Sequence, residues 1–392
     1  MSSLRVAIEM VLSWLVSGLA FLLSGRRAEK HVLILASNGD ENIGDVALLR
    51  AAIQNIDGRI VVLARDPGSY RIEDADRARV KVVSTQLVWG TLMERLSSMA
   101  AFGRYLRLSR EFCVIGADNM DGGYGDHFAI SEWKTAIVAR LLGVPTRVFG
   151  FSWSDSATPD ALRASKVALR LGSVAYLRDP ESYRRFKAVI PGKVVLAADM
   201  VFLLRPTRGV FATPHSPFVI LNVSALIASR VDLAADYRVI VRGILDRGYQ
   251  ILVLPHVGGM GNDDRVAARD AIGDSAQSTD VVFVDDLLEP EEISAVASKA
   301  TFVITGRMHL SVLAMTSAVP SFVLATQGKV EGLMELAGVP ENAIVPAPGF
   351  SSLVLDLIEK EDLASTSKAI NGRLPHIQEL ARRNFDRLIA LG

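Results

Sequence analysis

The sequence has few of the cysteines and histidines that disulfides and zinc sites require, and it has no excess of basic residues. Its 392 residues include one cysteine, Cys113, and six histidines. One thiol cannot close an internal disulfide, and no cysteine–histidine spacing fits zinc, so we expect no metal and a reducing compartment. Forty-three basic residues balance forty-three acidic ones, which argues against a nucleic-acid partner. The absence of a G-x-S-x-G elbow disfavours a covalent hydrolase.

An apolar segment is present at the N-terminus, residues 6–23, but its uninterrupted part is shorter than the ~20 residues that cross a bilayer. As a helix it would carry one narrow polar stripe, formed by Glu9, Ser13 and Ser17. Three basic residues follow closely: Arg26, Arg27 and Lys30. An interfacial or re-entrant membrane helix, a signal anchor and a helix packed on a partner are all possible. We favour a cytoplasmic protein that touches the inner face of the cytoplasmic membrane through residues 6–23.

The remainder of the chain alternates between strand-like and helix-like segments. In the first half, apolar β-branched runs lie at 31–36, 60–63, 80–83, 112–115, 146–150, 174–177 and 194–196. In the second half they lie at 218–223, 249–254, 281–284, 302–304 and 321–324. Because helix-length segments separate these runs, the pattern predicts an α/β fold of two doubly wound, Rossmann-like domains that face a cleft.

The domain boundary is predicted by prolines and glycine that interrupt this alternation between residues 204 and 217. The resulting division has five parts: a hydrophobic helix at 1–30, a Rossmann-like acceptor domain at 31–205, a linker at 206–217, a Rossmann-like donor domain at 218–375 and a C-terminal helix at 376–392.

The most informative motif is Gly306-Arg307-Met308-His309, which lies where an apolar strand turns into a helix-like segment. Such a turn directs backbone N–H groups and the positive helix end toward an anion. Arg307 adds a planar fork that grips a carboxylate or phosphate, and His309 can titrate near neutral pH. The alternative is an arginine that caps a carbonyl and a histidine packed under a helix. The position of the motif after a strand favours an active site.

A second polar loop, residues 37–45, follows the first strand. It lacks the glycine spacing of a dinucleotide site and the Lys-Ser/Thr pair of a P-loop. Asn38, Asn42 and Asp45 therefore suit the hydroxyl groups of an acceptor better than a phosphate. The alternative is a tight turn in which Asn42 or Asp45 only caps the following helix.

Three further residues at strand ends are candidates. Arg178 could share a multiply charged anion with Arg307, or pair with a nearby carboxylate on the surface. His256 could bind substrate or act as an acid or base, or bond to a loop carbonyl. Lys329 could supply another cation, or be a solvated lysine at a helix start. Asp263 and Asp264, which follow His256, are interpreted as helix N-cap residues.

Together these residues resemble the polysaccharide pyruvyl transferase family. The family's G-D-x-A-[IL]-L helix start is similar to residues 44–49, and its R-x-H turn is similar to Arg307-Met308-His309. Its R-D-x-x-S element looks like residues 178–182, and its strand-end aspartate looks like Asp199. The resemblance covers roughly residues 31–345.

The resemblance implies a GT-B-like fold and transfer of the enolpyruvyl carbons of phosphoenolpyruvate to a sugar, as a cyclic ketal. By this resemblance Arg307 and His309 form the active-site pair, and Arg178 and Lys329 help to bind phosphoenolpyruvate. No cofactor, metal or nicotinamide is expected. The acceptor would be a cell-surface glycan or its lipid-linked precursor. Two alternatives are a GT-B-like glycosyltransferase that uses a nucleotide sugar and an inactive scaffold in glycan assembly.

Overall fold

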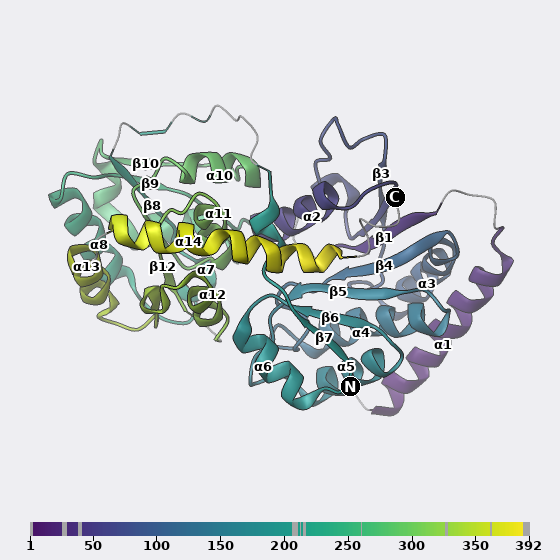
Figure 1. Cartoon of the computed structure of the whole chain (residues 1–392). Coiled ribbons are helices and arrows are strands. Elements are labelled where there is room, and N and C mark those ends of the chain that lie inside the picture. Colours follow the sequence, from purple (N-terminus) through teal and green to yellow (C-terminus); the bar gives the residue numbers. More distant parts are fainter. Residues whose placement is uncertain are drawn as a thin grey trace. The chain divides into compact units, whose positions relative to one another are not determined.

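The computed structural model describes residues 3–25, 30–37, 41–205, 211, 213–214, 217–259, 261–325, 328–360 and 363–386 (Figure 1). The chain forms two compact units. The first comprises Met1–Asp40, Leu48–Met200 and Leu380–Gly392, and the second comprises Glu41–Ala47 and Val201–Glu379. Much of the predicted linker, 206–217, lies outside the described residues.

The first unit is built on a seven-stranded parallel sheet in the order β3-β2-β1-β4-β5-β6-β7. Each strand predicted from an apolar run is confirmed within a few residues, because β-branched side chains suit a sheet covered on both faces. Cys113 is fully buried in this sheet. The strands are β1 (His31–Leu35), β2 (Ile60–Ala64), β3 (Val80–Ser84), β4 (Ser109–Ile115), β5 (Thr146–Phe151), β6 (Val174–Leu177) and β7 (Lys193–Leu196).

Helices connect these parallel strands. The sequence determines where several begin. Thr91 and Glu94 form a capping box at the start of one helix. Asp179, which directly precedes Pro180, caps another helix by accepting a hydrogen bond from the Ser182 N–H. The helices are α1 (Ser3–Leu23), α2 (Ile43–Asn55), α3 (Leu92–Arg107), α4 (Asp126–Leu141), α5 (Pro159–Arg170) and α6 (Pro180–Val189). The helix expected at 1–30 is thus α1. The first turn of α2 belongs to the second unit.

The second unit repeats the arrangement with a parallel sheet in the order β10-β9-β8-β11-β12-β13. Its strands are β8 (Phe218–Leu221), β9 (Gln250–Val253), β10 (Val281–Phe283), β11 (Val303–Thr305), β12 (Ser321–Leu324) and β13 (Ala343–Ile344). The two-residue β13 was not predicted, since it is too short to show a period. In both sheets the strand order reverses once, between β1 and β4 and between β8 and β11. Ligands of such sheets bind beyond the strand ends at this reversal.

The helices of the second unit include the element that follows the Arg307 turn. They are α7 (Ala225–Ala228), α8 (Ala234–Asp246), α9 (Asp264–Ile272), α10 (Pro290–Ala297), α11 (Met308–Met315), α12 (Lys329–Ala337), α13 (Phe350–Lys360) and α14 (Leu363–Arg382). The C-terminal helix expected at 376–392 therefore begins earlier, at Leu363, and residues after 386 lie outside the described range. Among the described residues no helix is both long and apolar enough to cross a membrane.

The chain returns to the first unit after α14. The Asn384 side chain is fully buried, and its Oδ1 accepts a hydrogen bond of 3.0 Å from the backbone N–H of Gly150 in β5. The next ring, Phe385, packs on Phe149, with 5.4 Å between ring centroids. Asn384 and Phe385 are therefore part of the first unit's core.

Candidate active site

The Gly306–His309 turn lies at the strand reversal of the second sheet, directly after β11. Gly306 is required there: a Cβ atom would lie 2.6 Å from the Cβ of Ser224 in the loop after β8. The turn is tied to its own strand, because the Arg307 N–H donates to Thr305 Oγ1 at 2.9 Å. The sequence therefore holds Arg307 and His309 in a fixed position at the switch point.

The Arg307 guanidinium is anchored by Asp264, the first residue of α9. Its Nη2 lies 2.6 Å from Asp264 Oδ1 and 3.0 Å from Asn262 Oδ1, and its Nε lies 3.2 Å from Asp264 Oδ2. The Arg307 side chain keeps 12% of its surface exposed, whereas the Asp264 carboxylate has none. The pair orients the fork and leaves part of it accessible to solvent.

Asp264 is also bound by three backbone N–H groups from two segments. Its Oδ2 accepts bonds from the N–H groups of His256 and Val257, at 3.2 and 3.1 Å, and its Oδ1 accepts one from Ala225 N–H at 3.0 Å. The Asn222 amide adds a fourth bond of 3.0 Å and is itself bonded to Thr305 Oγ1 at 3.0 Å. One buried carboxylate thus joins the ends of β8, β9 and β11 to Arg307.

Asp263 and Asp264 were both interpreted from the sequence as N-cap residues, and this interpretation is confirmed only for Asp263. Asp263 caps α9, since its carboxylate accepts a bond from the Arg265 N–H. The side chain of Asp264 instead points into the site. One feature of the sequence could have indicated this role: Asp264 directly follows the N-cap residue, and one carboxylate already suffices to cap the helix.

His309 is buried in the first turn of α11 and faces the N-terminus of α2. A Cβ atom on Gly44 would lie 2.3 Å from His309 Nδ1, so only glycine permits this approach. Asn42 caps α2 through a 3.0 Å bond from Gly44 N–H, as one of the two predicted capping residues, and its amide lies 3.3 Å from Asp45 Oδ2. Asn42 and Asp45 are therefore close to the His309 ring. Asn38 lies outside the described residues.

His256 is part of the same cluster. Its carbonyl accepts a 3.1 Å bond from Ile43 N–H, and the next residue, Val257, pairs with Asn42 as an isolated bridge. Its ring is buried, and neither ring nitrogen has a hydrogen-bond partner among the described residues. Burial, and then the nearby His309 and Arg307, hold the pKa of His256 well below its usual value. The ring is thus a neutral imidazole at pH 7.

The remaining two predicted residues are buried at element starts. Lys329 is the first residue of α12 in the second unit. Arg178 follows β6 in the first unit, where its Nη1 lies 3.0 Å from Asp199 Oδ2, its Nη2 is paired with Asp118, and its Nε donates to Ser152 Oγ at 2.8 Å. Burial lowers the pKa of Arg178, and the two carboxylates raise it by more. The predicted surface pairing with a neighbouring residue is replaced by contacts to distant loops.

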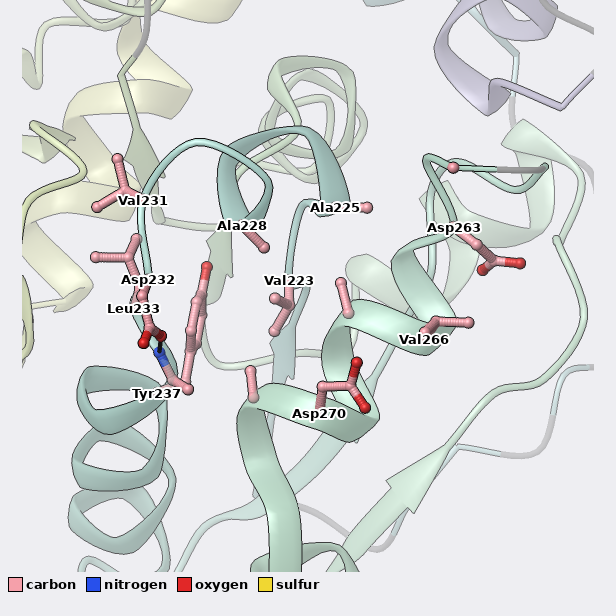
Figure 2. A pocket seen from close by; sticks show the side chains of 14 residues that line it. Val223, Ala225, Ala228, Val231, Asp232, Leu233, Tyr237, Asp263, Val266 and Asp270 are labelled. Atoms are coloured by element: carbon pink, nitrogen blue, oxygen red, sulfur yellow. Dashed lines mark hydrogen bonds between the residues drawn. The ribbon is translucent and has the colours of Figure 1, made fainter.

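A pocket of about 420 Å³ lies between α7, α8 and α9 (Figure 2). The hydroxyl end of Tyr237 points toward the α7 turn that carries Ala225 and Ala228. Burial and then the Asp264 carboxylate raise the pKa of Tyr237, so this hydroxyl remains protonated. The lining includes Asp232, Asp263 and Asp270, of which Asp263 is paired with Arg265, and none of the described lining residues is a lysine or arginine. The pocket suits hydroxyl donors and disfavours a phosphorylated anion.

No group of three or more histidine, cysteine, aspartate or glutamate side chains that could hold a metal ion occurs in the part of the chain that the structure describes.

The two doubly wound parallel sheets give the chain a GT-B-like fold. A sequence model of the family described as polysaccharide pyruvyl transferase matches residues 42–328, most of the chain. The chain therefore belongs to the polysaccharide pyruvyl transferase family, as the motifs predicted, and is a transferase that acts on polysaccharide. The matched range includes Asn42, Arg178, His256 and the Arg307–His309 turn.

Three solved structures that are similar in fold are two UDP-GlcNAc 2-epimerases and one protein complexed with a UDP-sugar. UDP-GlcNAc 2-epimerase from Neisseria meningitidis, bound to UDP-GlcNAc, has a TM-score of 0.59 and 11% identity over 92% of this chain and 100% of that chain. The epimerase from Methanocaldococcus jannaschii has a TM-score of 0.56 and 13% identity over 88% and 99%. Arabidopsis thaliana UGT89C1, complexed with UDP-L-rhamnose, has a TM-score of 0.59 and 11% identity over 93% and 99%. At such identities the similarity shows a shared fold.

Proposed function

We propose that the protein transfers the enolpyruvyl carbons of phosphoenolpyruvate to two hydroxyls of a sugar in a cell-surface polysaccharide or its lipid-linked precursor. Two C–O bonds to the donor C2 form and the C2–O bond to phosphate breaks. One hydroxyl proton is transferred to C3, which becomes a methyl group, and the other leaves with inorganic phosphate. The product is a cyclic ketal with a free carboxylate.

The observation that carries this proposal is the cluster of Arg307, His309 and His256 at one strand reversal, with the N-terminus of α2 against it. Phosphoenolpyruvate carries a carboxylate and a phosphate, and Arg307 offers a fork already oriented by Asp264. The first-turn N–H groups of α11 add positive potential at the same turn. Lys329, at the start of α12, is the second cation that we assign to the donor in this unit.

Proton transfer falls to the two histidines in this proposal. His309 serves as the group that gives a proton to C3 and takes one from a hydroxyl, a task suited to imidazole. His256, kept neutral by burial and by its charged neighbours, can accept a hydrogen bond from a sugar hydroxyl. Asn42 and Asp45 next to His309 supply polar contacts for the acceptor, as does Asn38 in the same loop.

We also propose that Arg178 binds the donor, which requires that one of its protein partners is displaced. Its Nε and both Nη atoms already have protein partners. A donor anion can reach it only by replacing a carboxylate, and Asp118, which is 28% exposed, is more accessible than the buried Asp199. We propose that donor binding exchanges Asp118 for the anion.

The test is incubation of purified protein with phosphoenolpyruvate and a panel of glycans, in the presence of EDTA because we propose a metal-free reaction. Phosphate release, matched by a mass gain of one pyruvyl ketal on the glycan, is the expected result. His309→Ala should lower the rate by about 10²- to 10⁴-fold. His376→Ala is the matched control, because His376 is exposed on α14. Phosphate release without a ketal, or full activity of His309→Ala, would contradict the proposal.

The same assay distinguishes the alternatives. A glycosyltransferase would consume a UDP-sugar and ignore phosphoenolpyruvate. The pocket of Figure 2 speaks against a nucleotide diphosphate there, because Asp232 and Asp270 line it and its described lining residues include no lysine or arginine. A scaffold protein would give no product with either donor and would be insensitive to His309→Ala.

A further inference from the structure

Helix α1 is attached to the first unit by its polar side. It packs on α3 and α4, and the polar stripe predicted from the sequence, Glu9, Ser13 and Ser17, is buried. Glu9 Oε1 lies 3.0 Å from Arg95 Nε and 2.5 Å from Lys134 Nζ. Burial raises the pKa of Glu9, and these two cations lower it by more, so the carboxylate is charged. A buried ion-pair cluster therefore fixes the rotation of α1.

The second half of α1 also packs closely against α3. Ser17 Oγ donates to the Met99 carbonyl at 2.9 Å, and a Cβ atom on Gly103 would lie 2.2 Å from the Ser17 carbonyl oxygen. Glycine at position 103 thus lets the backbones of α1 and α3 touch. Met10, Val16 and Phe21 pack against the core of the first unit. The orientation of α1 is specified by both polar and apolar contacts along its length.

The opposite side of α1 is apolar and exposed. Leu19 is 62% exposed and Leu22 is 75% exposed, values that are unusual for leucine in a folded domain. The exposed residues recur with helical spacing and form one stripe, which we call the outward face: Ile8, Val11, Leu12, Leu15, Leu19, Leu22 and Leu23, with Trp14 at its flank. Figure 1 shows α1, in purple, at the edge of the first unit with no further element of that unit over it. A continuous apolar stripe of this length marks an interaction site.

Basic residues of α3 lie beside the second half of α1, and others follow α1 in the sequence. Arg104, in the turn of α3 that touches α1, and Lys30 are exposed, and Arg107 lies over the Phe21 ring at 4.8 Å. Arg26 and Arg27 follow α1 in the sequence. The acidic residue of α1, Glu9, is neutralised inside. A convex leucine stripe with a flanking tryptophan and cations at one end matches an anionic bilayer surface, where apolar side chains enter the headgroup boundary and cations meet lipid phosphates.

We infer that the outward face of α1 docks the protein on the surface of a bilayer that contains anionic lipid, with α1 lying parallel to the membrane. This inference is independent of pyruvyl transfer. In this arrangement the polar stripe holds the domain and the apolar stripe faces outward.

The experiment is co-sedimentation of the full-length protein with vesicles of phosphatidylcholine alone or mixed with phosphatidylglycerol. We expect binding to the mixed vesicles that weakens as salt is added. The double variant Leu19→Glu/Leu22→Glu should bind these vesicles at least about tenfold more weakly than the original protein. Both positions are exposed, so its thermal unfolding should match the original protein. Val239→Glu/Val345→Glu, at two exposed valines of the second unit, is the control and should bind normally.

Two results would overturn the inference. One is the absence of vesicle binding, or binding that Leu19→Glu/Leu22→Glu leaves unchanged. The other is a concentration-dependent dimer that this double variant dissociates, without vesicle binding, which would assign the outward face to a second copy of the chain. Sedimentation velocity without lipid, run on both proteins, distinguishes the second result.

Discussion

The arginines Arg178 and Arg307 both follow a parallel strand and both pair with a buried aspartate, yet their surroundings differ. Every guanidinium nitrogen of Arg178 is bonded within the first unit, and its side chain is 2% exposed. Arg307 has one carboxylate partner, Asp264, whose other bonds are to backbone N–H groups and an amide. Its side chain remains partly exposed.

This difference separates a structural arginine from one that is oriented for a ligand. A guanidinium surrounded by two carboxylates already has its charge compensated, whereas Asp264 is shared with the strand-end loops and leaves Arg307 able to accept an anion. Both residues were predicted to bind the donor. The contrast therefore predicts that substitutions at Arg178 lower stability in addition to weakening the donor binding proposed for it, and that those at Arg307 act mainly on donor binding.

The largest expected effect is on stability at Arg178. Arg178→Met leaves the buried Asp199 carboxylate without its cation and should lower the free energy of unfolding by about 3–5 kcal/mol. Urea denaturation measures this change. In Arg178→Met/Asp199→Leu, which removes both charges, part of the loss should be recovered. If the single variant were as stable as the original protein, the structural role of Arg178 would be disproved.

A smaller effect, about 1.4 kcal/mol, is expected in donor binding at Arg307. Arg307→Lys retains the charge but loses the planar fork, so KM for phosphoenolpyruvate should rise about tenfold. Steady-state kinetics gives this value, and urea denaturation should show little change. A large loss of stability with an unchanged KM would make Arg307 the structural arginine and reverse the comparison.

A several-fold effect is expected where α2 meets His309. In Gly44→Ala the new Cβ displaces the His309 ring, so kcat should fall several-fold while KM for phosphoenolpyruvate changes little. The control is Gly372→Ala, since Gly372 is exposed in α14 and has open space around it. Equal kcat values for the two variants would exclude close packing of Gly44 on His309.

The last prediction concerns pH and the buried histidines. Burial lowers the pKa of His31 to about 4 in the folded first unit, against about 6.5 when unfolded. Below pH 6.5 the unfolded chain therefore binds more protons, and stability is lost as pH falls from 6.5 toward 4. His31→Phe should reduce this slope in urea denaturation at pH 7, 6 and 5. If the dependence of stability on pH is unchanged in this variant, it arises from His256 in the second unit instead.

Much of the fold could be predicted because strands and helices are encoded locally. β-branched runs identified twelve strands, and the motif around Arg307 was recognised from consecutive residues. The aspartate partners were missed for a physical reason: Asp118 and Asp199 reach Arg178 from loops far apart in sequence, and Asp264 binds three separate loops. The rotation of α1 was also missed, because a polar stripe suits either water or a buried ion pair.

The return of the chain after α14 has a consequence for biosynthesis. A ribosome releases the strands of the first unit long before Asn384 and Phe385, which fill the position beside Gly150 and Phe149. The nascent first sheet therefore stays incomplete at one face until these two residues have emerged. A chain that stopped before Asn384 would lack a part of the core of the unit that was made first.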